Sequence, residues 1–227
     1  MKNPLFLMSA LCLVQFSLHA QVTVVAPTAA PAGTVVVAPG TVLVRPLDST
    51  VLQRQLSTAP KVVIVTQAPQ PVVQTTKTTT VVETAGQPRR VYNSERNVVI
   101  VEDQGQSREL PYVTLPVLFV KGTAQLLDVE SKVALQQVAD VILAVSKTEP
   151  GSVYDIEGHT STDGTNEDNM ELSAARAQRV YDVLTQSYGI PATSLSAHGY
   201  GEIFPMYPQG NEEEMQQDRR VLVVRTK

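Results

Sequence analysis

The aromatic residues of this 227-residue chain are distributed unevenly, and their distribution limits where a core can form. Between Gln21 and Leu110 the only aromatic residue is Tyr92, and every later one follows Pro111. The same N-terminal stretch is rich in Val, Thr, Ala, Pro and Gln, with prolines at positions 27, 31, 39, 46, 60, 69, 71 and 88. Proline breaks helices and confines strands to sheet edges. The sequence therefore predicts that the core is built from the C-terminal half.

Residues 21–108 are accordingly predicted to be a Val/Thr/Pro-rich, low-complexity tether that is extended and largely disordered. With so few large apolar side chains, the segment buries too little surface to offset the entropy lost on folding. Near-repeats such as TVVAPTAAPAG and TVVVAPG support this interpretation. The alternative is that its β-branched segments (VTVV, TVVVA, KVVIV, TTTVVE) form short strands that pair with one another or with a partner. A further strand is the alternative for residues 97–101, in the transitional stretch that begins at Val91.

Residues 1–20 have the layout of a secretory signal peptide. Lys2 supplies a positive charge, an apolar run follows from Leu5 to Leu18, and the small Ala20 precedes the expected cut. The run is shorter than the roughly 20 apolar residues that span a bilayer, so we expect no transmembrane span in the mature chain. A buried N-terminal helix is the weaker alternative, because the following segment offers it no core. The single cysteine, Cys12, lies inside this run, so the mature chain is expected to have neither a disulfide nor a thiol nucleophile.

The charge of the chain changes sign along its length. The net charge is −4, yet residues 21–90 carry six Lys/Arg against two Asp/Glu. Residues 111–227 carry nine Lys/Arg against sixteen Asp/Glu. An acidic C-terminal domain is a poor binder of nucleic acid, so we expect no nucleic-acid partner.

Residues 109–227 show the pattern of a compact α/β domain. Apolar runs and helical periodicity predict the order strand, helix, strand, helix, strand, strand, at 114–120, 128–146, 151–158, 166–187, 195–201 and 219–225. In the second strand, Val153, Asp155 and Glu157 are expected to point outward. This order predicts an α+β sandwich, in which two main helices lie on one face of a small mixed four-stranded sheet that follows the disordered tether.

The helix expected at 166–187 carries two arginines on its apolar side. A helical wheel centred on its apolar residues places both Arg176 and Arg179 within the apolar arc. A guanidinium there needs an anionic partner or a cleft. For Arg179 a structural ion pair is the simpler explanation, with one of three carboxylates as partner: Asp155, Glu157 and Asp182. Arg176, which lies nearer the preceding loop, is the better candidate for binding a ligand.

The stretch GHTSTDGTNEDNMELSAARA contains side chains that enzymes and metal sites use, but not in their patterns. His159 with Asp163 and Asp168 matches no recognised metal-ligand spacing. Ser161 near His159 lacks the G-x-S-x-G elbow of a hydrolase nucleophile. We therefore expect no enzymatic activity, no metal and no cofactor, and we interpret His198 in LSAHGYG as a strand residue beside a turn.

Several motifs in the C-terminal half together resemble one family. They are LPVLFVKGTAQL, the GHT turn, Gly164, Asn169, LSxxRA with Arg176, HGYGE and an Arg-Arg-Val strand. In this order and spacing, from about Tyr112 to Lys227, they are similar to the C-terminal peptidoglycan-binding domain of the OmpA/Pal/MotB family. The resemblance implies a non-catalytic periplasmic module, associated with the cell wall or outer membrane, that binds the meso-diaminopimelate of the peptidoglycan stem peptide.

The resemblance also implies a pocket with two ends, one for a carboxylate and one for an ammonium. Arg176 matches the carboxylate-binding arginine, since a guanidinium suits bidentate contact with a carboxylate. The complete implied set is Arg176, Asp163, Ser161, Thr160, Asn169 and Arg220. Of these, Asn169 matches the family asparagine, and Arg220 lies in the Arg-Arg segment that borders the pocket.

The chain departs from the family at two places. The family usually has Asp directly after GHT as the counter-ion of the ammonium, and here that residue is Ser161. We expect Asp163, two residues later, to replace it, helped by Ser161 and Thr160. The family's Asn-Arg-Arg segment is also changed, because Asp218 precedes the two arginines.

Two alternative functions follow from these departures. In the first, the domain is a structural interaction protein with a degenerate pocket, and its N-terminal segment recruits an outer-membrane or secretion partner. In the second, it hydrolyses cell wall, which the missing nucleophile and metal patterns disfavour.

Overall fold

The computed structural model describes residues 47–63, 88–103, 105–126 and 129–227. The expected signal peptide, Cys12 and most of the Val/Thr-rich segments lie outside the described residues. The strands described are β1 Lys61–Val63, β2 Arg89–Asn93, β3 Val98–Asp103, β4 Gln106–Leu115, β5 Tyr154–Gly158, β6 Leu195–Gly199 and β7 Val221–Arg225. The helices described are α1 Ser49–Ser57, α2 Val129–Thr148, α3 Asn166–Asp182 and α4 Glu212–Asp218. A π-helical turn, Val183–Ser187, continues α3, and a 3-10 turn, Ala192–Ser194, precedes β6.

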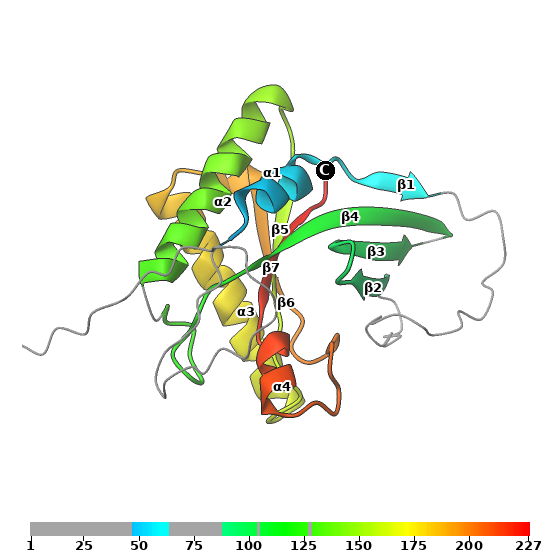
Figure 1. The fold of residues 1–227 in the computed structure, drawn as a ribbon, viewed down its shortest axis with the longest axis vertical. Coiled ribbons are helices and arrows are strands. Elements are labelled where there is room, and N and C mark those ends of the chain that lie inside the picture. Colours follow the sequence, from blue (N-terminus) through cyan, green and yellow to red (C-terminus); the bar gives the residue numbers. More distant parts are fainter. Residues whose placement is uncertain (1–46, 64–87, 104, 127–128) are drawn as a thin grey trace, which may run out of the picture. The chain divides into compact units, whose positions relative to one another are not determined.

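The seven strands form one mixed sheet with the order β2-β3-β4-β7-β5-β6, and β1 pairs with β4 as well. Only β5 and β6 are parallel neighbours; the other pairs are antiparallel. The long strand β4 joins the two parts of the sheet, as Figure 1 shows. Its first half pairs with β1 and β3, and its residues Tyr112–Leu115 pair with β7.

The predicted fold class is confirmed, with helices α2 and α3 packed on the same face of a mixed sheet. The predicted strand number is wrong, because the sheet has seven strands rather than four. The extra strands come from residues assigned to the tether: β1, β2, β3 and the start of β4. The alternative is confirmed at two of them, because β1 lies in the KVVIV segment and β3 overlaps the strand expected at 97–101. The expected boundary between residues 108 and 109 falls within β4.

Helix α1 also lies within the expected tether, and its capping and packing explain why it folds. Asp48 accepts hydrogen bonds from the backbone N–H groups of Thr50 and Val51, which are otherwise unpaired at a helix N-terminus. Leu52 and Leu56 are buried among the side chains of α2 and β4. The tether prediction is wrong here because these leucines bury their surface in a core that the C-terminal half supplies.

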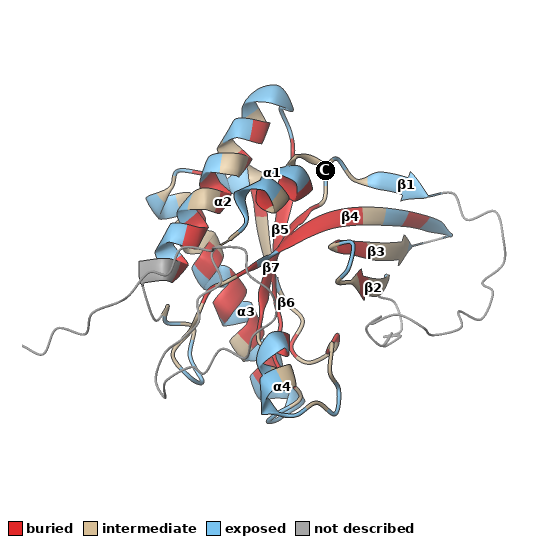
Figure 2. Ribbon diagram, viewed as in Figure 1, coloured by how far each residue is buried: buried red, intermediate tan, exposed pale blue. Residues whose placement is uncertain are grey.

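Both faces of the sheet are covered, as Figure 2 shows by the buried colouring of β5 and β7. The helical face holds the larger core, which includes Leu135, Ile142 and Val180. A second core on the opposite face contains Tyr92, Val99, Leu110, Tyr112, Phe204, Leu222 and Val224. Because this core covers the second face, the expectation that Asp155 and Glu157 point to solvent is wrong, and both are buried.

Two glycines let α3 approach the sheet closely. A Cβ atom built on Gly158 would lie 2.1 Å from the backbone oxygen of Ser173, and one on Gly199 would lie 2.4 Å from the backbone nitrogen of Ala174. Ser173 accepts a hydrogen bond from the Gly201 backbone N–H at 2.8 Å, which ties α3 to the turn after β6. This packing sets the short distance between α3 and the ends of β5 and β6.

Candidate functional site

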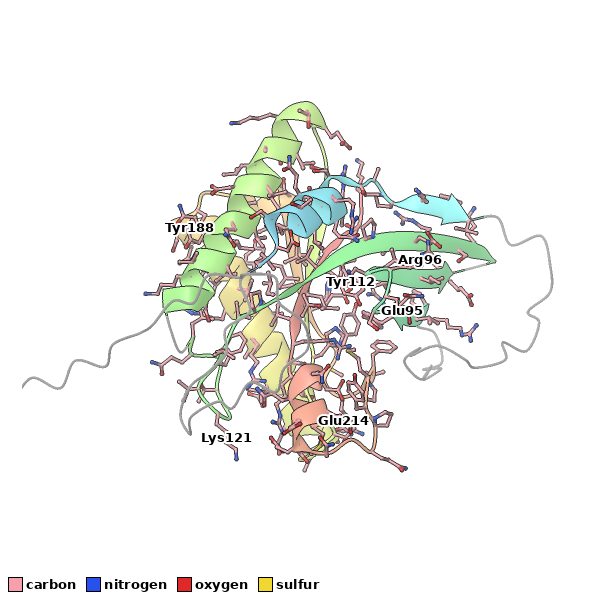
Figure 3. All side chains as sticks on the ribbon, viewed as in Figure 1. Glu95, Arg96, Tyr112, Lys121, Tyr188 and Glu214 are labelled. Carbon is pink, nitrogen blue, oxygen red and sulfur yellow. The ribbon has the colours of Figure 1, made fainter. Side chains whose placement is uncertain are left out.

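A cavity of about 630 Å³ lies where the loop after β4, the loop after β5, α3 and α4 meet. In Figure 3 the labelled Lys121, which belongs to its lining, lies at the same end of the sheet as α4, which carries Glu214. The lining residues are Val117, Leu118, Phe119, Lys121, Gly122, Thr160, Ser161, Asp163, Asn169, Leu172, Arg176, Glu212, Gln216 and Arg219. Five of the six residues implied by the resemblance are therefore brought together, and only Arg220 is not.

Arg176 is buried in the cavity wall, with 8 % of its surface exposed. Its Nε donates a hydrogen bond to the backbone oxygen of Thr123 at 3.1 Å, and its guanidinium lies 5.1 Å from the ring centre of Phe119. Within the described residues, its two terminal nitrogens have no hydrogen-bond partner. Burial lowers the pKa of Arg176, and the nearby Arg219 lowers it further. An anion bound in the cavity would compensate for this desolvated charge.

Arg219 lies on the other side of the cavity and forms several polar contacts at once. Its Nε donates to the Ser161 hydroxyl at 3.1 Å, and its Nη2 donates to Asp163 Oδ2 at 2.8 Å. Its Nη1 donates to Glu212 Oε1 at 2.5 Å and to Gln216 Oε1 at 2.8 Å. These contacts raise the pKa of Arg219, with the hydrogen bond to Glu212 as the largest cause.

Arg220, which the sequence placed at the pocket, instead faces the second core. Its Nη2 donates to the backbone oxygen of Phe204 at 3.0 Å, and its Nη1 pairs with Asp218 at 3.3 Å. Adjacent residues that enter a strand point to opposite faces. When one arginine of the Arg-Arg pair points into the cavity, the other therefore points away from it. Arg219 is the arginine that lines the cavity, and the sequence had indicated Arg220 instead.

Thr160, Ser161 and Asp163 lie on one loop, which follows β5. The Ser161 hydroxyl is 3.4 Å from Asp163 Oδ2, and the side chain of Asp163 is 57 % exposed. Thr160 is buried, and within the described residues its hydroxyl has no hydrogen-bond partner. The loop therefore places the Asp163 carboxylate and the Ser161 hydroxyl at the cavity, whereas the Thr160 hydroxyl is enclosed.

Asn169 lines the cavity but acts mainly as a support. Its side-chain amide donates to the backbone oxygen of Asp163 at 2.8 Å and to Glu202 Oε2 at 2.5 Å. Both N–H groups of the amide are then used. Asn169 thus holds the Asp163 loop against the first turn of α3.

His159 is packed against the aromatic residues of the second core, in a position that does not suit a catalytic acid or base. Its ring stacks on Tyr200 and meets Tyr92 edge-on. Its Nε2 lies 3.7 Å from Glu157 Oε2, which is longer than a hydrogen bond. Burial, aided by the nearby Arg220, lowers the pKa of His159 to about 4, so the ring is neutral near pH 7. In the part of the chain that the structure describes, no three His, Cys, Asp or Glu side chains are placed to hold a metal ion.

The helical wheel placed one arginine correctly and one wrongly. The buried stripe of α3 is Asn169, Ser173, Arg176, Ala177 and Val180. Arg179 is exposed and forms no ion pair with a described residue, so its expected structural pair is wrong. Asp155 instead contacts His198 Nδ1 at 2.6 Å and accepts from Ser196 at 2.8 Å, and His198 is the strand residue that was predicted.

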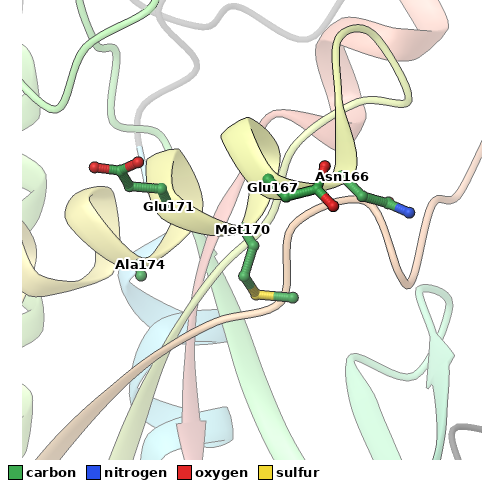
Figure 4. Close-up of a pocket in the computed structure, with 5 residues that line it drawn as sticks. All are labelled: Asn166, Glu167, Met170, Glu171 and Ala174. Atoms are coloured by element: carbon green, nitrogen blue, oxygen red, sulfur yellow. The ribbon is translucent and has the colours of Figure 1, made fainter.

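A second hollow, of about 480 Å³, lies on the solvent side of α3 (Figure 4). It is lined by Asn166, Glu167, Met170, Glu171 and Ala174. None of these five side chains is buried, and no cation is among them. The hollow therefore has no preorganised polar group comparable to Arg176.

Comparisons with known proteins place the cavity within a family match. Residues 118–219 match the OmpA family. The chain is 36 % identical over 94 residues to outer membrane porin F of Pseudomonas aeruginosa, covering 40 % of this chain and 27 % of that protein. It is 29 % identical over 128 residues to motility protein B of Helicobacter pylori, covering 56 % and 48 % respectively. The chain thus spans about half or less of the length of these relatives.

A solved structure, the peptidoglycan-associated lipoprotein of Burkholderia pseudomallei, is 27 % identical and has a TM-score of 0.42. The match covers 48 % of this chain and 88 % of that one.

Proposed function

Residues 118–219 form a domain of the OmpA family, and on that premise we propose that the chain is a non-catalytic, peptidoglycan-binding module of the periplasm. The observation that carries the proposal is Arg176, a buried arginine in the wall of a 630 Å³ cavity, whose terminal nitrogens have no hydrogen-bond partner among the described residues. Keeping a desolvated guanidinium without an anion costs free energy, so such a residue favours a site for an anionic ligand.

The ligand group that fits best is the diaminopimelate of the stem peptide. Its free end carries a carboxylate and an ammonium, and the cavity has groups for both. Arg176 binds the carboxylate through its two terminal nitrogens. On the other side, Asp163 is the carboxylate that an ammonium would approach, with Ser161 and Thr160 on the same loop and Asn169 holding that loop in place.

The proposed location follows from the sequence and the family together. The chain is exported by the segment at residues 1–20 and acts in the periplasm, at the cell wall or outer membrane. In the described residues, no helix is both long and apolar enough to cross a bilayer. Residues before the domain connect it to the rest of the envelope.

Sedimentation with purified peptidoglycan sacculi tests the proposal. The full chain should sediment with sacculi, and Arg176→Gln should reduce binding about tenfold or more, because a charge-assisted bidentate contact is lost. Arg179→Gln is the matched control, since it removes the same charge from an exposed position of the same helix. Equal sedimentation of the native protein and Arg176→Gln would contradict the proposal, as would no sedimentation of either.

The second candidate is an OmpA-like interaction protein whose pocket no longer binds ligand. The observation in its favour is that Ser161 stands where the family usually has Asp, with Arg219 bonded to its hydroxyl. In that case the N-terminal segment recruits an outer-membrane or secretion partner. Co-purification of a membrane protein with the full chain, without binding to sacculi, would support this candidate.

A further inference from the structure

Arg219 links both carboxylates of the cavity lining. It contacts Asp163 on the loop after β5 and Glu212 on α4, at 2.8 and 2.5 Å. It also donates to the hydroxyl of Ser161, the residue at the family's counter-ion position. One guanidinium thus crosses the end of the cavity at which an ammonium would have to bind.

The charges of the lining are unequal between the two ends. Three cations, Lys121, Arg176 and Arg219, face two carboxylates, Asp163 and Glu212. Both carboxylates are already paired with Arg219, whereas the terminal nitrogens of Arg176 are unpaired within the described residues. The anion-binding end, at Arg176, is therefore free to take a ligand. At the cation-binding end, the charges of Asp163 and Glu212 are already neutralised by Arg219.

We propose that Arg219 determines the specificity of this cavity, by occupying the ammonium end so that the ligand is selected by its carboxylate. The inference rests on the proposed function, because it concerns the same cavity and ligand. It differs in its consequence: a ligand with the carboxylate but without the ammonium binds nearly as well as the zwitterionic one.

The physical reason is competition for the same carboxylate. An ammonium that approaches Asp163 shares this side chain with the guanidinium of Arg219 and is repelled by it. Ser161 offers no charge in return, and its hydroxyl oxygen already accepts a bond from Arg219 Nε. The gain from the ammonium contact is therefore small while Arg219 is present.

Two probes of the same carbon skeleton test the inference: meso-diaminopimelate and pimelate, which lacks both amines. The native full chain should bind them with affinities within about threefold of each other. Arg219→Gln frees Asp163 and Glu212, so it should raise the preference for diaminopimelate about tenfold. Isothermal titration of both proteins with both probes measures the ratio directly.

Glu213→Gln is the matched control, because it removes one carboxylate from an exposed position of α4 that does not line the cavity; its ratio should stay at the native value. Arg219→Lys provides a second variant, since a single ammonium cannot reproduce the planar guanidinium, whose three nitrogens contact four side chains at once, and its ratio should rise as well. The melting temperature of each variant verifies folding.

The inference is overturned if the native chain already prefers diaminopimelate by tenfold, or if both Arg219 variants keep the native ratio. Failure of either probe to bind any of these proteins also overturns it. Binding of the native chain to sacculi is measured in parallel. If the native chain binds sacculi but the Arg219 variants keep the native ratio, only the role of Arg219 is contradicted, and the proposed function stands.

Discussion

Tyr92 of β2 donates its hydroxyl hydrogen to Glu157 Oε2 of β5 at 2.7 Å, across 65 residues of sequence. Arg90, two residues earlier, forms an ion pair with the other oxygen of the same carboxylate. Burial alone would raise the pKa of Glu157, but interactions with His159, Arg90 and Tyr92 hold it below its usual value. Besides the backbone pairing of β3 with β4, the hairpin β2–β3 is therefore linked to β5 through one fully buried carboxylate, two residues before the His159–Asp163 loop.

The first prediction concerns this hydroxyl. Tyr92→Phe removes one of the bonds to a buried carboxylate and should lower the free energy of unfolding by about 1–3 kcal/mol. Tyr112→Phe is the control, since its hydroxyl only approaches the Asn93 backbone oxygen at 3.5 Å, and it should cost less than about 1 kcal/mol. Urea denaturation measures both, and equal losses would contradict the role assigned to Tyr92.

The second prediction concerns pH. The pKa of His159 falls from 6.5 in the unfolded chain to about 4 in the folded one. The unfolded state therefore binds a proton first, so stability is full above pH 6.5 and is lost as the pH falls toward 4. The slope approaches roughly 1.4 kcal/mol per pH unit, up to about 3 kcal/mol in total.

His159→Phe isolates this contribution. Both ring nitrogens of His159 are buried and without a hydrogen-bond partner in the described structure, so an apolar ring of similar size should be tolerated. The stability of the variant relative to the native protein should increase as the pH falls from 6.5 to 4.5. Urea denaturation at several pH values gives both curves, and parallel curves would rule out His159 as the titrating group.

The third prediction concerns the glycine contact that positions α3. Gly199→Ala places a Cβ 2.4 Å from the backbone of Ala174, so the helix must shift, at a cost of roughly 3 kcal/mol or more. Gly189→Ala meets no atom within 4 Å and has φ +70°, so it should cost only about 1–2 kcal/mol. Thermal unfolding compares them. A shifted α3 also moves Arg176, so Gly199→Ala should weaken binding to sacculi, and Gly189→Ala should not.

Much of the site could be predicted because its motifs are local. Thr160, Ser161, Asp163, Asn169 and Arg176 lie in one continuous stretch, and the structure brings all of them to the cavity. The error between Arg219 and Arg220 has a simple origin. The direction of either side chain depends on where β7 begins, and a shift of one residue reverses both.

The misassigned tether has a different cause. The segment's own aromatic content predicts no core, but Leu52 and Leu56 bury their surface against α2, about 80 residues away in sequence. The ion pair between Arg90 and Glu157 likewise joins residues 67 apart. Composition within a segment cannot reveal a core that another segment supplies.

The last prediction concerns coupling between Asp163 and Arg219. While Arg219 holds Oδ2 of Asp163, Asp163→Asn should lower the affinity for diaminopimelate less than about threefold. In an Arg219→Gln background the carboxylate is free for the ammonium, so the same substitution should cost about tenfold. Asp168→Asn is the control in both backgrounds, since this exposed residue in the first turn of α3 does not line the cavity. Titration of the native chain, the two single variants and the double variant with diaminopimelate gives the coupling between Asp163 and Arg219. Equal losses of affinity in the two backgrounds would mean that the two residues act on the ligand independently.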